Sequence, residues 1–465
     1  MTGFPRSIKL GIGAVLVVLV LVPVVVCQVS LRRTARHYDR EENGAGVSLR
    51  EFPFPFRCAL TISSDVDGTT SVGEFLTIQE FLNTRNQTPL GQGLGLEIGN
   101  TFFAKSDRFG FLSPNPVDRE VILDLLRSGY VDGIHSFDMA RTREEIERVV
   151  ETLSTAGASI DVWINHGTAP SNLGPGSGCL GDDDGSVPYH TDFSVNRLGY
   201  EFVWMGAVSG IVGQGRPISS ASFVDGFDRR HPIRSLLNNV AQEQMKFTLA
   251  ALGSSRYSMR RYNELVRVAR LDDGQPVFEF TRSNQCPSGL WGECATAPGL
   301  ADTLRDEVLD ALVDGGGYMI VYTHLGKNEG FPHLPPPTVQ ALRSLAERNR
   351  SGTVWVTTTS RLLRYYVNKT YLQWEASGSG GETEIVIQTT QDPVRGVLEP
   401  DVEALGGVTF YVEDPEKTTV LLSGEKIEVV MNPPDGSGRK SVTIPLRPLE
   451  RLDDKMNAYR SRGYF

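Results

Sequence analysis

Between residues 52 and 366 the sequence alternates short apolar runs with longer amphipathic stretches. The stretch at 143–156 follows Thr142, with Glu145 three residues further on, which is the capping-box signature of a helix start. Further helices are expected at 117–128, 301–314 and 337–348. Strands are expected at 58–63, 101–104, 133–136, 160–165, 201–205, 277–281, 318–323 and 354–357.

This alternation predicts an α/β fold in which a parallel sheet is covered by helices. The number of strand candidates is sufficient for a closed or partly closed β/α barrel over residues 52–366. An open doubly wound sheet is the alternative, because a sequence does not show how far a sheet curls.

After residue 366 the pattern changes to short runs in which apolar and polar residues alternate, separated by turns rich in Gly, Pro and Asp. Such runs are typical of antiparallel strands. We therefore expect an antiparallel β-sandwich over residues 367–448, followed by a helix or tail at 449–465.

Residues 10–29 contain no charged side chain and are long enough to cross the hydrocarbon layer of a membrane as a helix. A cleaved signal peptide is the rival interpretation, but no A-x-A site follows the run. We expect a short N-terminal segment at 1–9, a transmembrane helix at 10–29 and a juxtamembrane linker at 30–51. The net charge of −10 argues against nucleic acid as a partner.

The cysteines indicate the compartment. Cys286 and Cys294 enclose a short loop and are predicted to form a disulfide, with Cys58 and Cys179 as a second potential pair. Disulfides are typical of oxidising compartments, so we expect a single-pass membrane protein with its folded part outside the cytoplasm. The arginines on both sides of the apolar run conflict with this orientation.

Polar side chains follow several of the predicted strands. Asp65 and Asp67 come after the first strand, and His135, His166 and His324 each stand where a later strand ends. Because the carboxyl ends of parallel strands meet at one edge of a sheet, these side chains are expected to converge. Asp and His ligands suit Zn²⁺ or a similar divalent ion.

The order of these pieces resembles that of the NodB-type polysaccharide deacetylases, carbohydrate esterase family 4. The family's first motif T-F-D-D-G corresponds to Ser-Asp-Val-Asp-Gly at 64–68, and its A-T-F-F strand to Asn-Thr-Phe-Phe-Ala at 100–104. Its H-S-x-x-H motif begins here at His135, and its late histidine corresponds to His324. The resemblance covers residues 57–366 and implies a barrel of the deacetylase type.

The resemblance also implies residue roles. Asp67 and His135 match metal ligands of the family, whereas the position of the second motif histidine is Met139. His166, from a neighbouring strand end, is then expected to supply a third ligand, with Asp138 as the alternative. The ion would polarise an N-acetyl carbonyl of a glycan, with Asp65 as general base and His324 protonating the leaving amine.

Two other functions remain open. Asp65-Val66-Asp67 also fits the D-x-D of a metal-dependent glycosyltransferase. A protein that kept the fold and lost its ligands would be a carbohydrate-binding or scaffold protein, and Met139 and the absence of an R-P-P motif favour it. Asn165, Trp204 and Arg282 are predicted to contact the sugar, although Trp204 as core packing is equally consistent with the pattern.

Overall fold

The structure is a computed structural model that describes residues 45–106, 108–137, 140–176, 178–286, 294–328 and 334–465. The predicted transmembrane helix at 10–29 lies outside these residues. None of the helices in the described ranges has the length and apolar character needed to span a membrane.

The core of the molecule is one large sheet, built around the fully buried strand β2 (Cys58–Asp65). Strand β13 (Tyr318–Thr323) pairs with one side of β2, while β14 (Val354–Val356) and β5 (Gly99–Phe102) pair with the other, all in parallel. The sheet continues in parallel from β5 through β6 (Val131–His135) and β7 (Val162–Ile164) to β8 (Phe202–Trp204) and β11 (Pro276–Phe280). The antiparallel strand β10 (Val266–Arg270) forms its edge.

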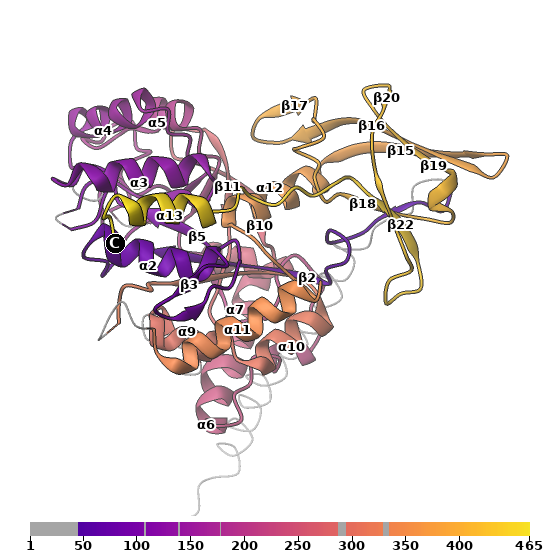
Figure 1. The fold of residues 1–465 in the computed structure, drawn as a ribbon, viewed down its shortest axis with the longest axis horizontal. Coiled ribbons are helices and arrows are strands. Elements are labelled where there is room, and N and C mark those ends of the chain that lie inside the picture. Colours follow the sequence, from indigo (N-terminus) through magenta and orange to yellow (C-terminus); the bar gives the residue numbers. More distant parts are fainter. Residues whose placement is uncertain (1–44, 107, 138–139, 177, 287–293, 329–333) are drawn as a thin grey trace, which may run out of the picture.

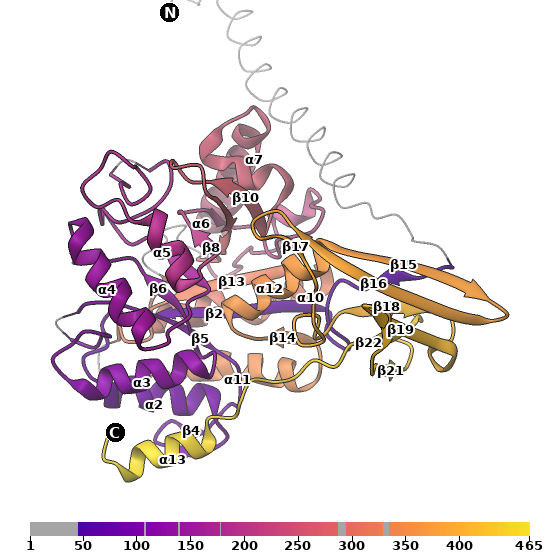
Figure 2. The same ribbon diagram turned by 90° about the horizontal axis from the view of Figure 1, so that it is seen from above.

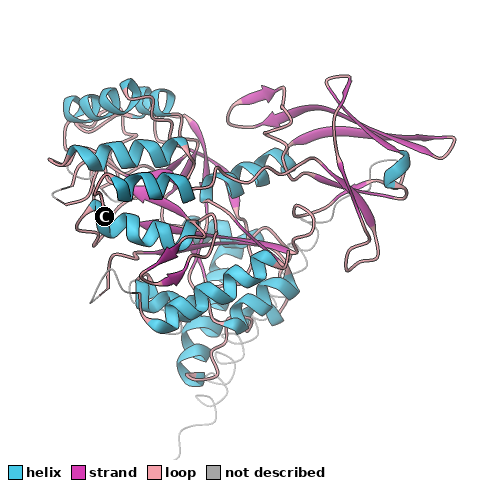
Figure 3. Ribbon diagram, viewed as in Figure 1, coloured by secondary structure: helices cyan, strands magenta, loops and turns pink. Residues whose placement is uncertain are grey.

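This sheet curls strongly. Strand β11 lies beside β8, but β12 (Arg282–Ser283), which begins only one residue after β11 ends, pairs with β13 and with β9 (Val208–Ser209). β11 and β12 are therefore separated by a single residue, although they lie far apart in the strand order of the sheet. The mixed α/β fold with a curled, half-barrel sheet confirms the predicted class at this level (Figure 3).

Helices cover the outside of the sheet because each has one apolar face. Thr142 and Glu145 form the predicted capping box at the start of α4. In Figure 1, α4 and the helices next to it lie one below another on the side of the sheet where β5 is labelled. The helices of the main domain are α2 (Val72–Asn83), α3 (Pro116–Arg127), α4 (Arg143–Thr155), α5 (Thr191–Leu198), α6 (Pro232–Ser235), α7 (Gln242–Ala251), α9 (Ala297–Thr303), α10 (Asp306–Gly315), α11 (Pro336–Arg350) and α12 (Thr359–Thr370).

The C-terminal part contains two small sheets whose inner faces meet at Trp374 and Phe410, with ring centroids 5.0 Å apart. One sheet holds β15 (Leu372–Ser379), β16 (Glu382–Asp392), β17 (Gly396–Leu398), β19 (Thr418–Leu422) and β20 (Glu425–Lys426). The other holds β1 (Ser48–Leu49), β18 (Thr409–Val412), β21 (Val430–Asn432) and β22 (Lys440–Thr443).

Two details of this region correct the predictions. The sandwich is not wholly antiparallel, because β16 and β19 pair in parallel. Residues 48–49, expected within the linker, instead form β1 and pair with β18. A two-residue strand carries no periodicity, so only its partner reveals it.

The last segment returns to the main domain as helix α13 (Asp453–Ser461), on the side of α2 and α3 (Figure 2). Leu452, Met456 and Tyr459 are buried in the same apolar cluster as residues of α2 and α3. The Tyr459 hydroxyl donates to Asp124 of α3 at 2.9 Å, and Arg460 pairs with Glu80 of α2. The chain end is therefore part of the main domain's core.

We predict that Met456→Ala lowers the free energy of unfolding by about 2–4 kcal/mol, because it leaves a cavity in this core. Ala458→Ser, on the exposed side of the same helix, is the control and should cost less than about 0.5 kcal/mol. Chemical denaturation of the two variants measures the difference. Equal effects would show that α13 contributes little to the core.

Candidate functional site

The carboxyl ends of the parallel strands bring the predicted metal ligands together. Asp67, His135 and His166 each offer a ligand atom, and these three atoms all lie within 4.8 Å of one another. His135 is the last residue of β6, His166 is the second residue after β7, and Asp67 is the second residue after β2. The register of the sheet explains this meeting, since His135 lies opposite Ile164 of β7.

Asp67 is the residue of this group with the most polar neighbours. Its Oδ2 lies 2.9 Å from Nε2 of His324, 3.8 Å from Nε2 of His166 and 3.3 Å from Nζ of Lys327. Burial by itself raises the pKa of Asp67, but the hydrogen bond from His324 and the surrounding positive charges together hold it well below its usual range. Asp67 is therefore an ionised carboxylate with the charge that a cation site requires.

His135 and Asp65 form a buried pair behind this carboxylate. Nε2 of His135 lies 3.3 Å from Oδ2 of Asp65, and Nδ1 of His135 has no hydrogen-bond partner among the described residues. Burial lowers the pKa of His135 to about 4, with Asp65 opposing this effect. His135 is thus neutral near pH 7, which is the form that binds a metal.

Aromatic packing fixes both histidine rings. The centroids of His135 and His166 are 4.3 Å apart, and Phe103 contacts both rings at 4.8 and 5.4 Å. Ser136, directly after His135, has a φ of +43°. A serine in this left-handed region is unusual and occurs most often where a functional residue must be oriented.

Asp65 is fully buried, and Arg282 is one of the groups that neutralise it. The Thr101 hydroxyl donates to Oδ1 of Asp65, and Nη2 of Arg282 lies 3.7 Å from the same oxygen. The guanidinium of Arg282 lies against the rings of both Trp204 and Tyr322, 4.5 Å from each centroid. Burial raises the pKa of Asp65, but His135, Arg282, His324 and Thr101 together lower it below the usual value.

These contacts change two predicted sugar-binding roles. Arg282 is completely buried and therefore acts on Asp65 instead of reaching a sugar. One face of Trp204 is occupied by Arg282, and its indole N–H donates to the carbonyl of Ala207. Sequence reasoning missed Thr101, Tyr322 and Lys327, although Tyr322 is two residues before His324 and so projects from the same face of the strand.

Asn165 has a local structural role. Its Oδ1 accepts from the indole of Trp163 and from the backbone N–H of Leu173, and its Nδ2 donates to the carbonyl of Leu173 at 2.6 Å. These bonds hold the loop after β7 and so place His166. The predicted contact between Asn165 and sugar has no support in this arrangement.

The disulfide between Cys286 and Cys294 is present in the structure. Ala295, next to Cys294, accepts a hydrogen bond from Nδ1 of His324 at 2.6 Å. Cys58 and Cys179 do not pair with each other as considered above, and both are free thiols.

Searches of protein-family models, curated proteins and solved structures found no match to this chain. The chemistry of the site is therefore argued from its own residues.

His190 is a histidine whose role differs from that of the site residues. Its Nε2 lies 3.0 Å from the carbonyl of Ser171, and its Nδ1 lies 2.7 Å from the hydroxyl of Ser194. This combination suits a neutral ring that donates once and accepts once. Burial lowers the pKa of His190 to about 4. His190 is therefore a fully buried structural residue.

We predict that Asp67→Asn and His166→Gln each weaken zinc binding by at least about 100-fold, because each removes one of three protein ligands. Both side chains are only partly buried, so the fold is expected to survive. His231→Gln is the matched control, since His231 is exposed. Titration calorimetry on the apo protein measures the affinity, and unchanged binding in both variants would contradict this site.

We also predict that His190→Gln reduces the loss of stability on acidification. A folded-state pKa of about 4, below the ordinary 6.5, means that the folded protein binds fewer protons between these values. Stability from neutral His190 is therefore complete above pH 6.5 and is lost as the pH falls towards 4, by up to about 1.4 kcal/mol per pH unit.

Asp132 and Glu264, whose pKa values burial raises to about 7, change the stability with pH in the opposite direction. Both are present in wild type and in His190→Gln, so the difference between the two proteins isolates the effect of His190. Denaturation midpoints at pH 7 and pH 4.5, with a chelator present, give the measurement. A difference between wild type and His190→Gln that does not change with pH would contradict the prediction. His231→Gln again serves as the control.

Proposed function

We propose that this chain is a metal-dependent hydrolase that removes acyl groups, N-acetyl in particular, from a glycan, in the manner of the polysaccharide deacetylases it resembles. The observation that carries the proposal is the meeting of Asp67, His135 and His166. His166 takes the place of the ligand that the resemblance puts at position 139. The inactive-scaffold alternative depends on the lack of such a ligand.

The residues present fit a zinc ion. Zinc binds histidine nitrogen and carboxylate oxygen at about 2.0–2.2 Å, so two of its ligand atoms lie at most about 4.4 Å apart. The limit of 4.8 Å for the three atoms is close to this span. The unpartnered Nδ1 of buried His135 provides an unsatisfied ligand atom, and ionised Asp67 provides the charge. With three protein ligands, the ion would retain an open position for water or substrate.

When bound, the ion would polarise the acyl carbonyl and make a water molecule more acidic. Asp65 is proposed to receive the proton of that water. Its Oδ1 is held by Thr101 and faces Arg282. Its Oδ2 lies 3.3 Å from Nε2 of His135 and forms no hydrogen bond in the described residues. The lowered pKa keeps this carboxylate ionised, which is the form that a general base requires.

His324 is proposed to protonate the leaving amine. Its Nδ1 faces the carbonyl of Ala295 at 2.6 Å, and its Nε2 faces the carboxylate of Asp67 at 2.9 Å. Because both neighbours are oxygen acceptors, the geometry suits a doubly protonated ring. The Tyr322 hydroxyl lies 2.8 Å from Nε2 and adds a second contact that orients the ring.

The proposed location is the outer side of a membrane, with residues 10–29 as the anchor. The long uncharged run supports the anchor, and the disulfide between Cys286 and Cys294 supports an oxidising compartment. The glycan partner is inferred from the resemblance.

The experiment that tests the proposal is acetate release from N-acetylated glycan oligomers by the zinc-loaded protein. We predict that Asp65→Asn retains zinc but lowers the rate by about 10²–10⁴-fold, the usual contribution of a general base. His231→Gln is expected to leave both zinc content and rate unchanged.

Two outcomes would contradict these roles. If Asp65→Asn loses zinc together with activity, then Asp65 positions His135 and is not the base. If the wild-type protein binds no zinc and releases no acetate, then the inactive-scaffold function replaces the hydrolase.

A further inference from the structure

The helix over residues 232–251 is apolar on two opposite sides. It consists of α6, a π-helical turn at Leu236–Ala241 and α7, without interruption. On its inner side, Val240 and Phe247 pack with Phe223 in a small separate core. The outer side of this helix also carries exposed apolar side chains, and a cluster of this kind marks an interaction surface.

The outer side concentrates the exposed apolar residues of the molecule. Half of the large apolar side chains that are exposed in the described residues lie between 224 and 252. All but Val224 lie on this helix or directly after it. We call this set the apolar tip, and its members are Val224, Ile233, Leu236, Leu237, Met245, Leu249 and Leu252. Figure 1 shows α6 at the outer end of this lobe.

The charge around the apolar tip is opposite to that of the whole chain. Residues 217–262 contain seven Arg or Lys and three Asp or Glu, whereas the whole chain has a net charge of −10. Asp225, Asp228 and Glu243 are each paired with an arginine or lysine. No carboxylate among the described residues pairs with the exposed arginines 229, 234 and 256.

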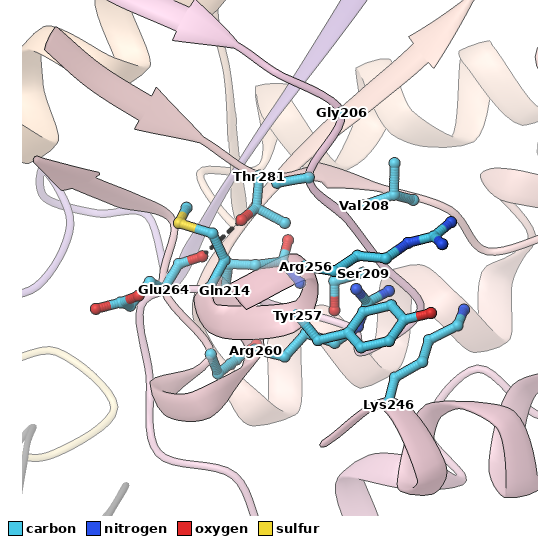
Figure 4. A pocket seen from close by; sticks show the side chains of 13 residues that line it. Gly206, Val208, Ser209, Gln214, Lys246, Arg256, Tyr257, Arg260, Glu264 and Thr281 are labelled. Atoms are coloured by element: carbon cyan, nitrogen blue, oxygen red, sulfur yellow. Dashed lines mark hydrogen bonds between the residues drawn. The ribbon is translucent and has the colours of Figure 1, made fainter. Parts of the chain in front are cut away.

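A basic pocket borders the apolar tip. It has a volume of about 210 Å³ and is lined by Lys246, Arg256 and Arg260 together with Tyr257, Ser209 and Glu264. Lys246 and Arg260 both pair with Glu243, whereas Arg256 has no carboxylate partner among the described residues. Figure 4 shows the polar ends of Lys246, Arg256 and Tyr257 on the same side of the pocket. Such a group of cations and a hydroxyl suits a phosphate oxygen.

We propose that the apolar tip docks on a bilayer that contains anionic phospholipid. Exposed aliphatic side chains and arginines on one helix are the composition of helices that lie in the headgroup region. Each cation near an anionic surface adds to the attraction. The exposed arginines 229, 234 and 256 lie in the same segment as these apolar side chains, and this charge favours an anionic lipid surface as the occupant.

This docking is distinct from the proposed chemistry and from the proposed anchor at 10–29. An anchor alone leaves the folded part free to rotate, whereas a second contact gives it a fixed orientation on the membrane. The apolar tip shares no residue with the group of Asp67, His135 and His166.

The test is hydrogen–deuterium exchange of the full chain in nanodiscs. One set contains phosphatidylcholine alone, and the other contains phosphatidylcholine mixed with phosphatidylglycerol. We expect slower exchange in peptides covering 229–252 with the anionic mixture, less slowing with phosphatidylcholine alone, and no change in peptides covering 382–398. Equal exchange in the two lipids would overturn the proposal.

Variants separate lipid from other partners. Ile233→Asp combined with Leu237→Asp should abolish the slowing, whereas Val397→Asp, equally exposed but on β17, should not. Slowing that depends on the number of chains per disc would indicate a second copy and overturn lipid docking. Zinc content should be unchanged in both variants, so a failure here leaves the proposed function untouched.

Discussion

The site depends on the burial of one ionised carboxylate. Asp65 has no exposed surface, and a charge in such a position costs several kcal/mol unless other groups compensate it. The compensation comes from Thr101, Arg282 and His135, which belong to β5, β12 and β6. Three separate strand ends are thereby held at one point. The short strand β12 explains how Arg282 reaches Asp65, because it crosses from β11 to pair with β13.

The sequence predicts the meeting of Asp67, His135, His166 and His324 for a simple reason. Each follows a strand, and the parallel arrangement puts the carboxyl ends of the strands at one edge of the sheet. The direction in which a long side chain points does not follow from this rule. Arg282 was expected at a sugar and is buried near Asp65, with its guanidinium against the rings of Trp204 and Tyr322.

The features that the sequence does not predict depend on contacts between distant segments. The pairing of β1 with β18 and the parallel pairing of β16 with β19 leave no local pattern, because side-chain alternation is the same in parallel and antiparallel strands. The buried position of His190 likewise follows from Ser171 and Ser194, which the fold supplies. Local patterns thus predict the elements, and long-range packing decides their partners.

The C-terminal sheets are attached firmly to the main domain. The ammonium of Lys369, at the end of α12, is fully buried and lies 2.5 Å from Oε1 of Glu51. The Tyr318 hydroxyl of β13 contacts the same carboxylate oxygen at 2.8 Å. Apolar residues of both parts, Ile320 and Phe410 among them, belong to one continuous core. The two parts are therefore expected to unfold together.

The return of α13 to the main domain has a consequence for biosynthesis. Residues of α2 and α3 emerge from the ribosome more than 300 positions before Met456 and Tyr459, which complete their apolar cluster. Until the last residues have been made, that cluster presents an open apolar surface, of the kind that chaperones bind and that aggregates nucleate on. Synthesis therefore cannot yield the complete main domain ahead of the C-terminal sheets, and a chain that stops early at residue 448 keeps this surface uncovered.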